Sequence, residues 1–167
     1  MLKTLPDAEA LLAQLAAAMR DTVDPARTAL VGIHTGGVWV AERLHAALGL
    51  KQPVGAIDVA FYRDDYSQRG LSANTRTSQI PFDVEDAHIV IVDDVLYTGR
   101  TIRAAMNEIF DYGRPARVEL AVLVDRGGRE LPVAASHCPL RVSLPAAQML
   151  ALERAGDGGL SFRLVDK

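Results

Sequence analysis

The segment Ile89–Thr101, IVIVDDVLYTGRT, limits what this chain can fold into more than any other part of the sequence. Its leading apolar residues indicate a buried β-strand, and helical periodicity begins near Arg100, after a turn that contains Gly99. When a strand enters a helix through a short turn, the first N–H groups of the helix have no partners within it, and its positive end points at the turn. Such a turn is a binding place for a phosphate group.

An acidic pair lies between this strand and the turn. Asp93 and Asp94 can bind the hydroxyls of a ribose, either directly or through Mg²⁺, because carboxylate oxygens suit both. Gly99 allows a close approach of the backbone, and the hydroxyls of Thr98 and Thr101 add hydrogen-bond donors. The segment thus offers hydrogen-bond donors for a phosphate and, a few residues away, acceptors for sugar hydroxyls. This combination is typical of a site for a pentose 5-phosphate.

The same pattern has a purely structural interpretation. Asp and Thr are common helix caps and glycine turns are frequent, so the segment is also compatible with an ordinary capped helix. The spacing is neither that of the Walker A motif nor that of the dinucleotide-binding G-x-G-x-x-G motif. Taken alone, the segment leaves a phosphate site and a structural turn both open.

The rest of the chain alternates between apolar runs and helical periodicity. Strands are predicted at Thr28–Ile33, Val54–Tyr62, His88–Val92 and Arg117–Val124, with further candidates at Arg141–Leu144 and Ser161–Val165. Helices are predicted from a cap formed by Thr4 and Asp7, over Val38–Leu48, which Gly49 ends, and from Arg100 to Asp111. This order predicts an α/β fold with a mostly parallel central sheet flanked by helices. In such sheets, ligands bind at the carboxyl ends of the strands.

The stretch Arg63–Ile80 is polar and charged, lacks periodicity and ends at Pro81. It predicts a long loop, and a solvated surface loop is the simplest interpretation. Loops of this length inside a compact domain are commonly lids or binding loops. A lid that closes over a substrate is therefore the functional alternative.

The motif VIVDDVLYTGRT resembles the phosphoribosyl pyrophosphate motif of type I phosphoribosyltransferases. Within that superfamily, the chain most resembles the PyrR family, pyrimidine operon attenuation regulators that also act as uracil phosphoribosyltransferases. LVGIHTGG (Leu30–Gly37) is similar to the family's first loop, and FYRDD (Phe61–Asp65) to the base of its flexible hood. GRPARVELAVLVDRGGRELP (Gly113–Pro132) is similar to its next strand and turn. The resemblance covers roughly Thr28–Pro132.

The resemblance implies a type I phosphoribosyltransferase fold in a single domain over residues 1–167, with a hood loop at about 63–80. It implies catalytic roles for Asp93, Asp94 and Arg63, and Mg²⁺ held by Asp93 and Asp94 directly, or only through ribose hydroxyls or water. The residues that it implies for substrate binding are Thr35, Gly36, Gly37, Asp93, Asp94, Val95, Leu96, Tyr97, Thr98, Gly99, Arg100, Thr101, Arg126 and Leu150.

These residues divide by the part of the substrate that the resemblance assigns to them. The backbone N–H groups of Thr35–Gly37 hold pyrophosphate, in a loop that often contains a strained or cis peptide bond. Tyr97–Thr101 surround the 5-phosphate, and Arg63 approaches the leaving group when the hood closes. Arg126 lies by the base pocket, and Leu150 contacts the uracil ring.

The sequence departs from the family pattern at Gly36, where an Arg is common. The lost charge would weaken the hold on pyrophosphate, and a Gly36→Arg change is expected to tighten it if the loop has room for the side chain. Tyr97 stands where hypoxanthine-type purine enzymes have an Asp that transfers a proton to the purine. A phenol does not replace a carboxylate at neutral pH. His34 is expected at the loop edge near pyrophosphate, and not as a catalytic residue.

The implied function is a uracil phosphoribosyltransferase that forms UMP and pyrophosphate from uracil and 5-phosphoribosyl-1-pyrophosphate, with Mg²⁺. One alternative is a UMP-responsive, RNA-binding attenuation regulator of pyrimidine genes with weak or no catalysis. A second alternative is another type I enzyme that acts on orotate or a purine. Relatives assemble as dimers or tetramers, so a homo-oligomer is expected.

Binding of a leader RNA requires clustered basic side chains to neutralise phosphates. The net charge of the chain is −3, and Met1–Asp21 has fewer basic than acidic residues. The most basic stretch is Tyr112–Arg141, whose arginines are Arg114, Arg117, Arg126, Arg129 and Arg141. The charge pattern therefore predicts shallow-slope, low-affinity RNA binding at most.

The remaining features favour a cytoplasmic protein without a membrane partner. Cys138 is the one cysteine, so no internal disulfide can form, which is typical of a reducing compartment. Pro6 and Asp7 interrupt the region where a signal peptide would need an apolar run. No stretch approaches the roughly 20 apolar residues that span a bilayer.

Overall fold

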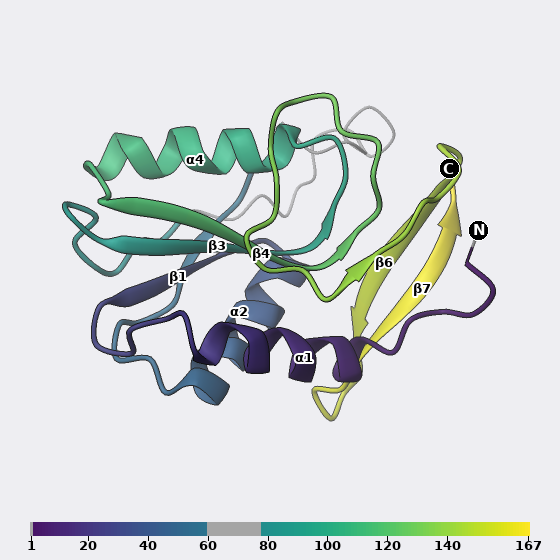
Figure 1. The fold of residues 1–167 in the computed structure, drawn as a ribbon, viewed down its shortest axis with the longest axis horizontal. Coiled ribbons are helices and arrows are strands. Elements are labelled where there is room, and N and C mark those ends of the chain that lie inside the picture. The colour runs from purple at the N-terminus through teal and green to yellow at the C-terminus, as the bar shows by residue number, and fades with distance from the viewer. Residues whose placement is uncertain (1, 60–77) are drawn as a thin grey trace.

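A computed structural model describes residues 2–59 and 78–167 of the chain (Figure 1). In this part of the chain the helices are α1 (Ala8–Arg20), α2 (Gly36–Leu48) and α4 (Arg100–Tyr112). The strands are β1 (Thr28–Ile33), β2 (Gly55–Ile57), β3 (His88–Leu96), β4 (Arg117–Asp125), β5 (Leu140–Arg141), β6 (Gln148–Arg154) and β7 (Leu160–Asp166). None of the helices in the described ranges is long and apolar enough to cross a membrane.

Five of these strands form one parallel sheet in the order β2-β1-β3-β4-β5. Helices α1 and α2 cover one face and α4 covers the other (Figure 1). Val90 and Val92 of β3 pack toward α1 and α2, whereas Ile89 and Ile91 pack toward α4. The central strand is therefore buried on both faces, which is why its apolar residues run without alternation. The predicted α/β fold, with a mostly parallel central sheet flanked by helices, is confirmed.

Strands β6 and β7 form a separate antiparallel hairpin that packs against α1 and α2. Glu9 of α1 fastens it, because its Oε1 accepts a hydrogen bond from the Leu160 N–H at 2.8 Å. Its Oε2 pairs with Nη2 of Arg43 on α2 at 2.6 Å. The Arg43 hydrogen bonds, with that of Leu160, lower the pKa of Glu9. The sequence predicted only the second strand of this hairpin, as Ser161–Val165, and missed β6.

Several predicted boundaries are corrected. Asp7 alone caps α1, since its Oδ1 accepts from the Ala10 N–H at 3.1 Å, and Thr4 takes no part in the cap. Helix α2 begins at Gly36, two residues before the predicted start. Strand β3 continues to Leu96 because β4 pairs with it that far. The acidic pair thus lies in the strand and not in the following loop.

Two predictions concern residues that the structure describes only in part. The strand predicted at Val54–Tyr62 is present as β2 over Gly55–Ile57, and residues 60–62 lie outside the described ranges. The hood predicted at Arg63–Ile80 lies outside the described ranges up to residue 77. At its end, Gln79 bridges to Ala56 of β2 with hydrogen bonds of 2.8 Å in both directions.

Candidate functional site

A cavity of about 380 Å³ opens at the carboxyl ends of β1 and β3, between α2, the start of α4 and the β6–β7 hairpin. Parallel strands of one sheet present these ends at the same edge, where ligands bind in α/β folds. Of the residues predicted to bind substrate, those that line the cavity are Thr35, Asp93, Asp94, Val95, Tyr97, Thr101, Arg126 and Leu150. The structure therefore brings the acidic pair, the turn and the expected base contacts together around one space.

The loop between β1 and α2 lies directly against the end of β3. A Cβ atom at Gly37 would lie 2.4 Å from the Val92 carbonyl oxygen, and one at Gly36 would lie 2.5 Å from Oδ2 of Asp94. The peptide bond between His34 and Thr35 is cis. At Gly37 the close approach of two backbones requires glycine, whereas at Gly36 the neighbour is the side chain of Asp94. Because the nearest atom to a side chain at Gly36 is the end of the Asp94 side chain, an Arg there must displace the Asp94 carboxylate, and the tightening of pyrophosphate binding by Gly36→Arg stays a prediction.

The acidic pair is oriented by hydrogen bonds from its own backbone. Oδ1 of Asp93 accepts from the Asp94 N–H at 2.9 Å, and Oδ1 of Asp94 accepts from the Val95 N–H at 2.8 Å. Asp93 is buried, with 9% of its surface exposed, and both side chains line the cavity. The described ranges contain no group of three or more acidic, His or Cys side chains that could hold a metal ion. Mg²⁺ commonly binds through one or two carboxylates together with substrate oxygens, so the donor set fits an ion that arrives with its substrate.

The turn after β3 is held by the loop that follows β4. Gly99 adopts the left-handed conformation, with φ 95°, and is the N-cap of α4. The Thr98 hydroxyl accepts from the Arg100 N–H at 3.2 Å, and the Thr98 carbonyl accepts from the N–H groups of Glu130 and Leu131 at 2.9 and 3.1 Å. The Arg100 side chain pairs with Glu130 at the surface, 2.7 Å away. Arg100 therefore lies outside the lining of the cavity, whereas Tyr97 and Thr101 of the turn are part of it.

Arg129 stabilises this turn through hydrogen bonds, a role that the sequence did not reveal. Its Nη2 pairs with Oδ2 of Asp125 at 2.6 Å, its Nε donates to the Val133 carbonyl at 2.7 Å, and its Nη1 donates to the Tyr97 carbonyl. Burial would raise the pKa of Asp125, but the hydrogen bonds from Arg129 and the Gly127 N–H outweigh it, and this pKa is lowered. Arg129, one of the arginines of the basic stretch Tyr112–Arg141, therefore uses its guanidinium for bonds within the fold and is only partly exposed.

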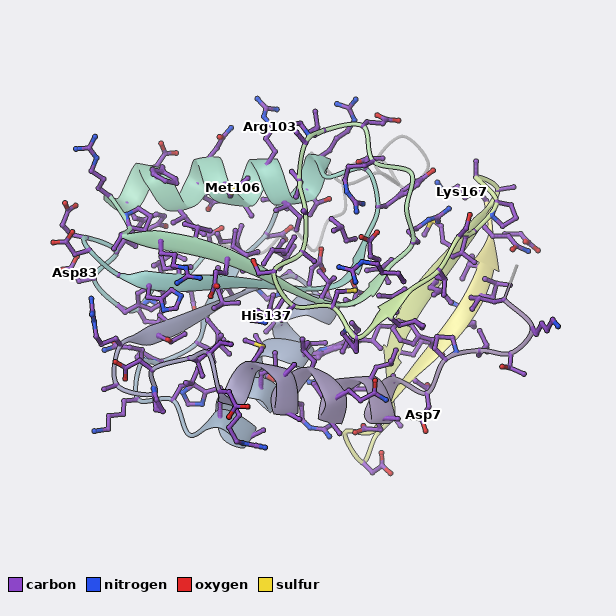
Figure 2. All side chains as sticks on the ribbon, in the orientation of Figure 1. Asp7, Asp83, Arg103, Met106, His137 and Lys167 are labelled. Atoms are coloured by element: carbon purple, nitrogen blue, oxygen red, sulfur yellow. The ribbon has the colours of Figure 1, made fainter. Side chains whose placement is uncertain are left out.

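The opposite wall of the cavity is apolar and aromatic. Leu150 of β6 is buried, and the guanidinium of Arg126 lies 3.9 Å from the centroid of the Tyr97 ring. Lys167, at the end of the hairpin in Figure 2, lines the cavity and holds its Nζ 5.0 Å from the same centroid. Trp39 lines it from the first turn of α2. Sequence reasoning missed Trp39, although its position four residues after Thr35 on a helix was a usable signal.

Other residues singled out in the sequence lie away from the cavity or outside the described ranges. Arg63 and the rest of FYRDD belong to residues 60–77, so their predicted roles stay predictions. Arg103 of α4 is exposed and points into solvent (Figure 2). The His34 N–H donates to the Ile57 carbonyl of β2 at 2.9 Å, which places the residue at the edge of the glycine loop.

An acidic pair at the end of the central parallel strand, a turn that leads into a helix, and a glycine loop facing the pair together form the arrangement of a type I phosphoribosyltransferase. The sequence profile of the family described as "Phosphoribosyl transferase domain" matches residues 1–146. The chain belongs to this phosphoribosyltransferase family, and within it to the PyrR family. The resemblance seen in the sequence motifs is thereby confirmed.

The relatives cover most of the chain. It is 51% identical over 155 residues to the bifunctional protein PyrR of Ralstonia nicotianae. That alignment covers 91% of this chain and 88% of the relative. It is 46% identical over 169 residues to that of Pseudomonas fluorescens strain Pf-5, covering 98% of each. Among solved structures, the hypoxanthine-guanine phosphoribosyltransferase of Bacillus anthracis has the same fold, with a TM-score of 0.66 and 13% identity over 85% of each chain. The hypoxanthine phosphoribosyl transferase of Trypanosoma cruzi also has this fold, with a TM-score of 0.64 and 21% identity. The match covers 85% of this chain and 79% of that one.

Proposed function

We propose that this protein is a uracil phosphoribosyltransferase that forms UMP and pyrophosphate from uracil and 5-phosphoribosyl-1-pyrophosphate. The observation that carries the proposal is the cavity in which the Asp93 and Asp94 carboxylates face the glycine loop on one side and Tyr97 and Leu150 on the other. The name of the relatives, bifunctional protein PyrR, agrees with a catalytic role beside a second one.

In the proposed reaction, N1 of uracil forms a bond to C1 of the ribose as the bond from C1 to the pyrophosphate oxygen breaks, and the N1 proton is released. The transition state has oxocarbenium character, so the chemistry needs a positioned sugar, a stabilised leaving group and little water. Mg²⁺, held by Asp93 and Asp94 with the substrate, would neutralise charge on pyrophosphate.

Each wall of the cavity supplies one of these needs. The hydrogen bonds that fix Oδ1 of Asp93 and of Asp94 hold both carboxylates ready for the ribose hydroxyls. The turn Tyr97–Thr101 leads into the positive end of α4 and would take the 5-phosphate. Backbone N–H groups of Thr35–Gly37 would take pyrophosphate, because the glycines leave no side chain between loop and ligand.

The residue at position 97 supports uracil over purines as the base. Tyr97 borders the cavity where the purine enzymes would need a carboxylate to exchange a proton with the base. The test is nucleotide formation with equal concentrations of uracil, orotate, hypoxanthine and guanine in the presence of Mg²⁺. Uracil should be converted and the purines should not. Faster nucleotide formation from guanine than from uracil would overturn the assignment.

The alternative function is a UMP-responsive, RNA-binding regulator. Two of the five arginines of the basic stretch are committed inside the fold, since Arg126 is 4% exposed and Arg129 is bonded to Asp125. Arg117 pairs with Glu119 at 2.7 Å. Because few cations remain for phosphates on this stretch of one chain, catalysis is the better-supported function and RNA binding the secondary one.

We also propose that residues 1–167 act as a single domain and that the chain assembles as a homo-oligomer, a dimer or a tetramer. An oligomer would place the remaining arginines of neighbouring chains side by side. Light scattering after size-exclusion chromatography measures the assembly, and a monomer at micromolar concentration would contradict the proposal.

A further inference from the structure

Arg126 joins two walls of the cavity. Its guanidinium lies over the Tyr97 ring, 3.9 Å from the centroid, and its side chain reaches the segment that leads into β6. There Nη1 donates to the Gln148 carbonyl at 2.5 Å, and Nη2 donates to the Pro145 carbonyl at 3.1 Å. The residue is 4% exposed, so these contacts are made in a water-poor environment in which they are strong.

The Tyr97 ring has little freedom to move apart from Arg126. A Cβ atom at Gly128 would lie 2.5 Å from Cε1 of Tyr97, so the backbone of the β4 loop packs tightly against the ring on that side. The Arg126 N–H also donates to the Leu96 carbonyl at 3.0 Å, directly before Tyr97 in the chain. A shift of Tyr97 must therefore displace Arg126, and through it the carbonyls of Pro145 and Gln148.

The two walls serve different parts of the proposed substrates. Tyr97 begins the turn that would bind the 5-phosphate, whereas Gln148 begins β6, which carries Leu150 on the base side of the cavity. A buried guanidinium with a planar set of donors holds two such segments in one relative position better than a flexible ammonium does.

We propose that Arg126 is a positioning residue that couples binding of the sugar phosphate to binding of the base. A ligand bound at the turn holds Tyr97 in place, and the contacts of Arg126 then hold Gln148 at the start of β6 in place as well. The base consequently binds more tightly to the side of the cavity that β6 forms. Linkage makes the effect reciprocal. The inference rests on the proposed function, because it takes the turn as the phosphate site and β6 as the base side.

The test measures binding by titration calorimetry, with quenching of Trp39 as a second readout, since Trp39 is the single tryptophan and lines the cavity. Uracil affinity is measured with and without saturating ribose 5-phosphate, and UMP is measured separately. In the wild type, ribose 5-phosphate should raise uracil affinity about tenfold, the usual size of coupling between two sites. Arg126→Gln should abolish this factor, so that uracil affinity is the same with and without ribose 5-phosphate.

Two variants and a control separate coupling from loss of structure. Arg126→Lys keeps the charge without the planar fork and should restore only part of the factor. Tyr97→Leu removes the ring from the other end, so it should lose the same factor, and the double variant with Arg126→Gln should lose no more. Arg163→Gln is the matched control, because Arg163 pairs with Glu153 on the surface of the hairpin, and it should leave the factor unchanged.

The outcomes distinguish the two proposals. A folded Arg126→Gln variant with the wild-type coupling factor overturns the positioning role and leaves the proposed function standing. If Arg126→Gln does not fold, an unchanged factor in Tyr97→Leu overturns it equally. Absence of UMP binding in the wild type overturns the proposed function and the coupling with it.

Discussion

Alanine at two adjacent glycines should separate stability from binding. At Gly37, the added Cβ would lie 2.4 Å from the Val92 carbonyl oxygen, which is backbone in the buried centre of the sheet. Carbon and oxygen need about 3.3 Å, so α2 and β3 must part by about 0.9 Å. Overpacking of this kind costs up to about 3 kcal/mol, and at about 2–4 °C per kcal/mol the Tm should fall by at most roughly 6–12 °C.

At Gly36, the added Cβ would lie 2.5 Å from Oδ2 of Asp94, which is the end of a side chain. The carboxylate can rotate away, and the main loss is its 2.8 Å hydrogen bond from the Val95 N–H. That costs about 1 kcal/mol, or a fall in Tm of roughly 2–4 °C. Because Asp94 leaves the position proposed for the ribose hydroxyls, binding of phosphoribosyl pyrophosphate should weaken by about tenfold or more, equal to about 1.4 kcal/mol.

Gly49→Ala is the matched control. Gly49 ends α2 with φ 62°, and nothing lies within 4 Å of an added Cβ. An alanine in the left-handed conformation costs about 1 kcal/mol, which is close to the cost expected at Gly36. Gly49 lies at the other end of α2 from Gly36, so its substitution does not touch Asp94. The assay combines thermal melting by circular dichroism with calorimetric titration of phosphoribosyl pyrophosphate and Mg²⁺.

Two results would refute this reasoning. If Gly37→Ala melts at the wild-type temperature, the close approach of α2 to β3 does not restrict the loop. If Gly36→Ala binds phosphoribosyl pyrophosphate as tightly as Gly49→Ala does, the Asp94 carboxylate does not hold the sugar.

Three further predictions concern the acidic pair, pH and RNA. Asp94→Asn should weaken Mg²⁺-dependent binding of phosphoribosyl pyrophosphate while the protein stays folded, and unchanged affinity in calorimetry would contradict the sugar-site assignment. The pKa of Asp125 is lowered in the folded protein, so its pairing with Arg129 should stabilise the protein above the unfolded pKa of about 3.9 and be lost as the pH falls through the folded pKa. In urea titrations, Asp125→Asn should therefore be less stable than the wild type near pH 6, and the two should converge as the pH falls through the folded pKa of Asp125. A difference that stays constant with pH would exclude this linkage. Binding to a pyrimidine-leader RNA should be weak and respond little to UMP. The logarithm of the affinity should fall only slightly with the logarithm of the salt concentration, since each neutralised phosphate adds about 0.7 to 0.9 to that slope. Tight, UMP-enhanced binding with a steep slope in filter assays would favour the regulator.

Local patterns in the sequence were sufficient to predict the central elements. The apolar runs of β1 and β3 and the periodicity of α4 depend on neighbours within the same segment, and all three were predicted. The end of β3 was not, because pairing with β4 extends it over Asp93 and Asp94 to Leu96. Strand β6 was missed, since its burial depends on helices at the other end of the chain.

Contiguous stretches of the sequence were enough to predict the central strands and helices and the acidic pair before a Thr-Gly turn, because these depend on neighbouring residues. Which distant residues complete the site depends on how the segments pack in three dimensions. This packing brings Trp39 and Lys167 to the cavity and turns Arg126 and Arg129 inward to carbonyls and to Asp125. An arginine in a polar loop has the same local signature whether it faces solvent or a buried carbonyl. Its role is set by packing between segments that are far apart in the chain, which no short stretch of sequence contains.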